Sequence, residues 1–241
     1  MSELALIKFL VVLCFLIYAS FLDLKYREIP NTIWKYMLIF GFPLVFLEFY
    51  LNKFRYLDFA VLQLVAMVAL AYILYLLNLY GGADAKAIMV LSALFPIYPH
   101  FNGYPILKIG FIFAFSVLSN SVIVAPILAI IMFIRNTIKE RFKISGSILY
   151  YFIGYRVDID SIPKFHNLLE YFDENGNLIR VKRAVEPNDE IISRLKYFAK
   201  EKNVKKIWVT PALPFILFIT AGYIVAFFIG DILLFILSLV L

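Results

Sequence analysis

Cysteine and histidine are scarce in this chain of 241 residues, which contains one cysteine and two histidines. Cys14 has no partner for an internal disulfide, and in its apolar stretch it is expected to be an inert small hydrophobe. His100 and His166 are isolated, and no His-Glu-x-x-His segment places two ligands on one helix face. Neither histidine lies in an apolar run near Ser145–Ser147 to activate a serine nucleophile. We therefore expect no metal, no other cofactor and no serine mechanism.

Charge is also sparse, at 17% of residues, whereas apolar residues make up 63% and the mean hydropathy is +0.87. A soluble domain carries roughly 45–50% apolar residues. The chain is therefore predicted to be a polytopic membrane protein. Its first apolar run has Glu3 near the start and no small-residue cleavage pattern after it, which favours a retained span over a removed signal peptide.

Six apolar runs predict six transmembrane helices. Most are long enough to cross a hydrocarbon core of about 30 Å at 1.5 Å per residue. The fourth run is the weakest, because its uninterrupted apolar part is nearer the length of a re-entrant segment. The six runs are 4–22, 32–51, 57–79, 84–99, 106–134 and 211–239.

Residues 135–209, between the fifth and sixth runs, differ in kind. They hold 15 of the 23 Lys and Arg, together with 10 acidic residues, and no long apolar run. Alternation of apolar and polar residues over Leu149–Val157 predicts a strand. Asn175-Gly176 between two short apolar segments predicts a hairpin. Apolar spacing in 187–202 predicts a helix, and Lys205–Val209 a last strand.

The predicted fold class is therefore a polytopic α-helical membrane protein with six transmembrane helices and a small α+β soluble domain inserted between helices 5 and 6. Residues 1–134 would form the membrane bundle of helices 1–5. Residues 135–209 would form the cytosolic insertion, and residues 210–241 helix 6.

The basic flanks of the insertion predict its orientation, because clusters of Lys and Arg next to spans stay in the cytosol. Six spans then place both termini outside, in a multi-pass protein of the cell membrane. The insertion's positive charge follows the membrane flanks, which favours contact with membrane lipids over nucleic acid. The flanking residues are Arg135, Lys139, Arg141, Lys143, Lys200, Lys202, Lys205 and Lys206.

Two aspartates, Asp23 and Asp84, stand at span ends on the predicted cytosolic side. An ionisable residue at a membrane span is costly to bury and is either snorkelling or functional. Two neighbouring carboxylates do not both ionise, so one keeps its proton as acid while the other serves as base for a water. The pattern predicts one two-aspartate site. Asp231, near the outer end of the last run, is expected to have a packing or snorkelling role.

The segment Gly81-Gly82-Ala83-Asp84-Ala85-Lys86 resembles the GxGD-type motif of intramembrane aspartyl proteases, with the Asp-x-Lys continuation of type IV prepilin peptidases. The segment from Asp23 to Asn31, with Arg27, Ile29 and Pro30, is similar to that family's first-aspartate pattern D-x-x-x-R-x-I-P-N. Pro211-Ala212-Leu213-Pro214 resembles the proline-alanine-leucine element of presenilin-type members. In its order of elements, the chain most resembles the archaeal preflagellin peptidase branch.

Two departures from the family's patterns bear on this resemblance. Ala83 stands where many members have glycine, and the archaeal branch accepts a hydrophobic residue there. The cysteine-rich zinc loop of many bacterial prepilin peptidases is absent, so no methyltransferase activity is expected.

The resemblance implies an aspartic-type endopeptidase with Asp23 and Asp84 as catalytic residues. Its implied substrates are preflagellins or pilin-like precursors, whose short basic leader is cut from an apolar helix at the cytosolic membrane face. The predicted substrate-binding residues are Tyr80, Gly81, Gly82, Ala83, Lys86, Pro211, Ala212, Leu213 and Pro214.

Other interpretations stay open on the residues alone. Lys86 is also typical of a positive-inside anchor, and prolines such as those of 211–214 favour a helix start. A proton-coupled transporter would use the same two aspartates as a relay, but would favour carboxylates at mid-membrane depth and inverted repeats, which are not apparent. A non-catalytic assembly factor would not need two matched aspartates.

Overall fold

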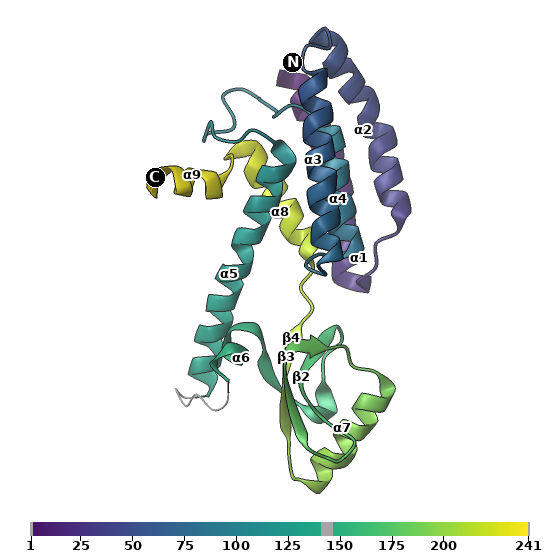
Figure 1. Cartoon of the computed structure of the whole chain (residues 1–241), viewed down its shortest axis with the longest axis vertical. Coiled ribbons are helices and arrows are strands. Elements are labelled where there is room, and N and C mark those ends of the chain that lie inside the picture. Colours follow the sequence, from purple (N-terminus) through teal and green to yellow (C-terminus); the bar gives the residue numbers. More distant parts are fainter. Residues whose placement is uncertain (1, 141–146, 241) are drawn as a thin grey trace. The chain divides into compact units, whose positions relative to one another are not determined.

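A computed structural model describes residues 2–140 and 147–240 (Figure 1). It divides into two compact units, residues 1–124 with 214–241 and residues 125–213. We call the first the helical unit and the second the sheet unit, and describe each by itself. Ser145, considered above for a serine mechanism, and Arg141 and Lys143, named above among the basic flanking residues, lie outside the described residues.

The helical unit consists of helices joined by short turns and one longer irregular segment. The helix α5 begins in this unit and ends in the sheet unit. The helices are α1 (Ser2–Tyr26), α2 (Asn31–Leu51), α3 (Leu57–Leu76), α4 (Gly82–Leu94), α5 (Phe113–Lys139), α8 (Phe215–Phe228) and α9 (Ile232–Val240).

Four helices, α1, α2, α3 and α5, are long and apolar enough to cross a membrane, and α8 with α9 is a fifth candidate if the 63° bend between them is taken as a broken span. The chain is thus a mostly helical protein with four to five candidate spans. The predicted fourth run forms α4, whose 13 residues rise only about 20 Å, less than a core of about 30 Å. The count of six spans therefore stays a prediction.

Helix α4 lies at the centre of the helical unit, in contact with α2, α3 and α8 (Figure 1). Its small and aliphatic residues fit this position, and Ala87, Leu91 and Leu94 are fully buried. A Cβ at Gly41 of α2 would come within 2.6 Å of the Leu94 side chain, so glycine allows the two helices to approach. Packing against three helices thus explains why α4 is mostly apolar beyond Lys86.

The chain between α8 and α9 is not helical, yet protein groups satisfy its backbone. Phe228 and Ile229 carbonyls accept from the amides of Ile106 and Leu107, at 3.1 and 2.7 Å. The Asn120 side chain donates to the Gly230 carbonyl and accepts from the amide of Ile232. Irregular backbone at membrane depth needs such partners. The sequence predicted one continuous sixth helix. That continuity is wrong, because this junction divides the segment into α8 and α9.

Asp231 belongs to the same junction and is fully buried. Its Oδ1 accepts from the hydroxyl of Ser119 at 3.0 Å and from the amide of Leu234 at 2.9 Å. The carboxyl therefore caps the start of α9 and ties it to α5. This is the packing role expected for it, with no sign of snorkelling.

The sheet unit is a four-stranded antiparallel sheet in the order β1-β4-β2-β3. Its predicted hairpin is confirmed, since β2 and β3 pair across the Asn175-Gly176 turn. The predicted helix is also confirmed as α7, which Asn188 caps by accepting from the amide of Ile191 at 2.8 Å. Its elements are α6 (Ile148–Ile153), β1 (Tyr155–Asp158), the 3-10 turn η1 (Ile159–Ser161), β2 (His166–Phe172), β3 (Leu178–Val185), α7 (Asp189–Glu201) and β4 (Lys206–Pro211).

Successive side chains of the central strands point to opposite faces of the sheet, and both faces are apolar. In β4, Ile207 and Val209 pack in the cluster that includes Leu195 of α7, whereas Trp208 packs with Tyr150 and Tyr151 of α6. The strand predicted for Leu149–Val157 is therefore wrong in its first half. That short apolar run forms a buried helix, a choice that periodicity alone does not settle.

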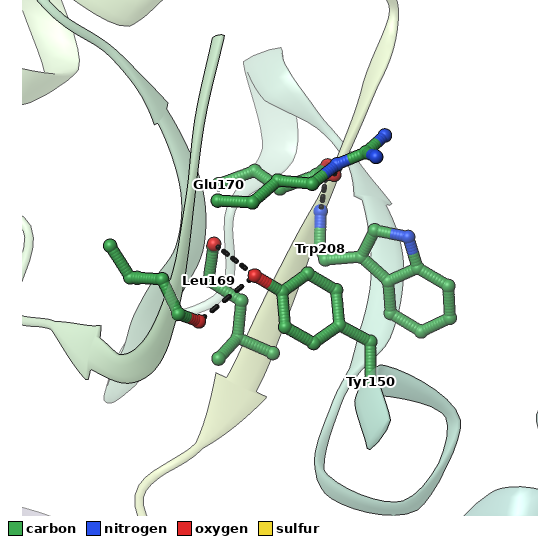
Figure 2. Close-up of polar contacts among 6 residues, drawn as sticks. Tyr150, Leu169, Glu170 and Trp208 are labelled. Carbon is green, nitrogen blue, oxygen red and sulfur yellow. Dashed lines mark hydrogen bonds and ion pairs between the residues drawn. The ribbon is translucent and has the colours of Figure 1, made fainter. Parts of the chain in front are cut away.

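The buried Glu170 carboxylate replaces a missing backbone acceptor where the pairing of the strands is irregular. The pairing of β2 with β4 ends at Leu168, and the register of β2 against β3 shifts between Leu168 and Glu170. Glu170 Oε2 then accepts from the amide of Trp208 at 3.1 Å, and Oε1 accepts from Nε of Arg180 at 2.9 Å. Figure 2 shows this contact beside the Tyr150 hydroxyl, which donates to the Leu169 carbonyl at 3.0 Å and to a second carbonyl, that of β3.

Replacing Glu170 with alanine is expected to loosen β4. The buried Trp208 amide would lose the acceptor that the Glu170 carboxylate provides, a loss of about 1–3 kcal/mol. Hydrogen exchange of the full-length protein in detergent, read by mass spectrometry, should show peptides of β4 exchanging about tenfold faster or more. Glu170→Gln keeps an acceptor and should lose less protection; equal exchange in the two variants would refute the role given to this side chain.

Candidate active site

Asp23 lies near the end of α1, three residues before the helix stops at Tyr26. The helix ends because Arg27 adopts a left-handed conformation, with φ of 58°, and its amide donates to the Asp23 carbonyl at 3.1 Å. The half-buried Asp23 carboxylate accepts from the amide of Ile216, in the first turn of α8, at 3.4 Å. Asp23 is therefore held between the ends of two helices.

Asp84 lies in the first turn of α4, where its Oδ2 accepts from the amide of Gly81 at 3.0 Å. This bond satisfies one of the free amides at the helix start. A Cβ at Gly81 would lie 3.0 Å from the same Oδ2, whereas a Cβ at Gly82 would meet only the Tyr75 ring, at 3.7 Å. The first of the two glycines therefore leaves room for the carboxylate.

The first turn of α8 brings the two aspartates to one end of the helical unit. Its Ile216 amide binds Asp23, and the ring of Phe215 packs on that of Tyr80 at 4.7 Å between centroids. Tyr80 precedes the Gly81-Gly82 turn that carries Asp84. The first turn of α8 therefore contacts the segments that carry both aspartates. Two carboxylates that approach each other are able to share one proton and act on a water together.

Lys86 lies two residues beyond Asp84 and binds a neighbouring helix. Its Nζ donates to Oδ1 of Asn31, the first residue of α2, at 2.7 Å. Asn31 closes the segment that begins at Asp23, so this bond joins the two aspartate-bearing segments directly. The sequence pattern included Asn31, but nothing in the pattern assigned it this partner.

The Pro211–Pro214 segment crosses the boundary between the two units. Pro211 ends β4, and the Ala212 amide donates to the Phe165 carbonyl at 2.9 Å within the sheet unit. Leu213 is exposed, and Pro214 precedes the first turn of α8 in the helical unit. Of the predicted site residues, the structure thus brings Tyr80, Gly81, Gly82, Ala83, Lys86 and Pro214 into one unit with Asp23 and Asp84.

Sequence reasoning missed the contribution of α8. Phe215 acts through its ring and Ile216 through its backbone amide, so neither carries a polar side chain that marks it in the sequence. Across residues 2–140 and 147–240, no group of three or more His, Cys, Asp or Glu side chains is arranged to hold a metal ion.

Comparison with known proteins identifies the family of the chain. The family model for the type IV leader peptidase family matches residues 10–134, and a model described as archaeal peptidase A24 C-terminus type II matches residues 146–232. Preflagellin peptidase of Methanocaldococcus jannaschii is 31% identical over 233 residues, covering 94% of this chain and 95% of that protein. Preflagellin peptidase of Methanococcus voltae is 29% identical over 225 residues, covering 90% and 92%.

The first match covers more than half of the chain and includes both aspartates, and the relative from M. jannaschii extends over nearly the whole of it. The two models together also follow the order of the helical and sheet-forming segments. The chain therefore belongs to the type IV leader peptidase family.

Proposed function

We propose that this protein is a membrane aspartyl endopeptidase that removes the short basic leader of preflagellins or pilin-like precursors at the cytosolic membrane face. Membership of a leader peptidase family and the name of these relatives support leader processing. The single observation that supports the mechanism is that the first turn of α8 contacts both aspartate-bearing segments, through the Ile216 amide at Asp23 and the Phe215 ring on Tyr80.

In the proposed mechanism, the ionised aspartate takes a proton from a water while the water oxygen attacks the scissile carbonyl carbon. The protonated aspartate donates to the carbonyl oxygen, which gives a tetrahedral diol. Its collapse breaks the C–N bond: the departing amine receives a proton from the aspartate that had acted as base, and the other aspartate, now ionised, takes a proton from one hydroxyl of the diol. No covalent bond to the enzyme forms, and the pair returns to one shared proton.

The cytosolic face is proposed from the distribution of basic residues around the helices. With this orientation, both aspartates lie where a basic leader meets the apolar helix of its precursor. Lipid headgroups would contact the basic sheet unit, and no nucleic acid is involved. The scissile segment is proposed to lie along the residues of the helical unit predicted for it, Tyr80, Gly81, Gly82, Ala83 and Pro214.

The test of this function is cleavage of a leader-bearing precursor by the full-length protein in membranes. A preflagellin-like substrate with a basic leader should be cut once, between leader and apolar helix, and mass spectrometry of both products gives the bond. A substrate without the leader's basic residues serves as control. If the precursor stays intact and protons cross vesicle membranes in a manner that depends on Asp23 and Asp84, the peptidase hypothesis is refuted and the transporter hypothesis is favoured.

A contrast between two adjacent glycines follows from the geometry. Gly81→Ala should lower the cleavage rate by about 10- to 100-fold, because its methyl group displaces the Asp84 carboxylate. Gly82→Ala meets only ordinary van der Waals contact and should lose far less. Initial rates at saturating precursor measure both. Equal rates for the two variants would mean that the position of Asp84 does not depend on the space at Gly81.

A further inference from the structure

The bond between Lys86 and Asn31 connects the starts of α4 and α2. Lys86 Nζ donates to Asn31 Oδ1 at 2.7 Å, from the second turn of α4 to the first residue of α2. A bond from an ammonium group is stronger than one between neutral groups. Both side chains are exposed, so the bond restrains the separation between these helix starts without burying either group.

Each end of this bond is coupled rigidly to one aspartate. Lys86 follows Asp84 in the same helix, between Ala85 and Ala87, which are both buried. On the other side, the segment from Asp23 to Asn31 is short and restricted, because Arg27 is left-handed and Pro30 has a fixed φ. Ile29 packs on the core of the helical unit.

The direction of Lys86 argues against direct contact with the Asp84 carboxylate. Residues two apart on a helix are about 200° apart around its axis and do not face each other. Within the described part of the chain, Lys86 is in none of the ion pairs shorter than 4.0 Å. Its charge is therefore directed to Asn31 rather than to either aspartate.

We infer that Asn31 and Lys86 are a positioning pair, which sets the separation of the Asp23 and Asp84 carboxyls for catalysis without touching the substrate. This inference rests on the proposed function and gives Lys86 a role other than the substrate binding predicted for it. The pair complements the bridge through α8, where Ile216 and Phe215 join the same two segments from another side.

The kinetic test uses Lys86→Met, Asn31→Ala and the double variant in the full-length protein. Each should lower kcat by about 10- to 100-fold and leave KM within about threefold, because misplacement by about 1 Å harms the chemical step more than binding. The double variant should be no slower than the slower single one. Asn31→Asp should retain most activity, since a carboxylate also accepts from Lys86.

The matched control is Lys35→Met, which removes the same charge one turn further along α2 from an exposed side chain. It should behave as wild type. A raised KM with unchanged kcat would make Lys86 a substrate-binding residue and overturn the inference. Single effects that multiply in the double variant, or a loss with Lys86→Met alone, would also overturn it.

A second readout does not depend on activity. Spin labels at Leu24 and Leu79, both exposed, report the separation of the two aspartate-bearing segments once Cys14 is replaced by serine. The distance distribution should broaden equally in Lys86→Met and Asn31→Ala, and stay narrow in Lys35→Met. Unchanged distributions would refute the positioning role. If the distributions broaden in the two variants but the wild-type protein cuts no precursor, the positioning role stands and only the proposed function is refuted.

Discussion

Replacing Asp84 or Asp23 with asparagine is expected to lower leader cleavage by about 10³- to 10⁴-fold, the upper part of the range for losing a positioned acid or base. Asparagine has nearly the same size, and its side-chain oxygen is able to accept from the Gly81 amide as Asp84 does. The carboxyl's ability to exchange a proton is what the substitution removes. Either loss should disable the pair, because acid and base act in the same step.

Rates under single-turnover conditions, at saturating precursor, measure this loss free of product release. The control is Asp58→Asn, which removes an exposed carboxylate from the first turn of α3 and should leave cleavage unchanged. Both catalytic variants should unfold at the wild-type temperature. Retention of more than about a tenth of the wild-type rate by either one would remove that residue from the acid–base pair.

Replacing Lys8 with methionine is expected to destabilise the helical unit by about 3–5 kcal/mol. Lys8 is fully buried in α1, its Nζ lies 2.6 Å from Oε2 of Glu48 in α2, and the same group lies over the Phe95 ring. Methionine fills a similar volume but leaves the Glu48 carboxylate, whose side chain is only 13% exposed, without its cation.

The double variant Lys8→Met/Glu48→Leu should recover most of this stability, because an apolar pair avoids the cost of desolvating two charges. Thermal unfolding of the full-length protein in detergent measures all three proteins. Cleavage per folded molecule should stay near wild type, since Lys8 lies about 22 Å from Asp23 along α1. A double variant as unstable as Lys8→Met would show that shape, rather than the unpaired charge, sets the cost.

The apolar runs predicted the helices of the membrane protein well where a run was long and ended in clear breaks, as for residues 32–51 and 57–79. They did not predict the end of α4 at Leu94, although Pro96 follows closely and disfavours further helix. In the last run, Gly230 and Asp231 interrupt the apolar sequence, but the break in the helix there also depends on partners far away, such as Asn120 and the carbonyl of Leu107. Tertiary hydrogen bonds of this kind leave no local pattern.

In the sheet unit, local chemistry identified the Asn-Gly hairpin and the cap at Asn188. It failed at Leu149–Ile153, where the helix α6 buries aromatic residues against Trp208. A short aromatic and aliphatic run suits either a strand or a buried helix. The packing partner, 55 residues or more along the chain, decides between them.

For the site, the motifs identified Asp23, Asp84 and Lys86 as residues, but their arrangement needed the structure. The sequence contains no signal that the Ile216 amide reaches Asp23 or that Phe215 packs on Tyr80. Both contacts come from α8, more than 130 residues after Asp84. The positioning role proposed for Lys86 could not be predicted for the same reason, because its contact with Asn31 is apparent only in the structure.

The most direct test of the two-aspartate account is the single-turnover cleavage rate of Asp23→Asn, Asp84→Asn and the double variant, measured with one precursor under one set of conditions. If the carboxyls act as a unit, the double variant should be within about threefold of the slower single variant. If the two losses multiply instead, the aspartates contribute independently, and their joint activation of one water is contradicted.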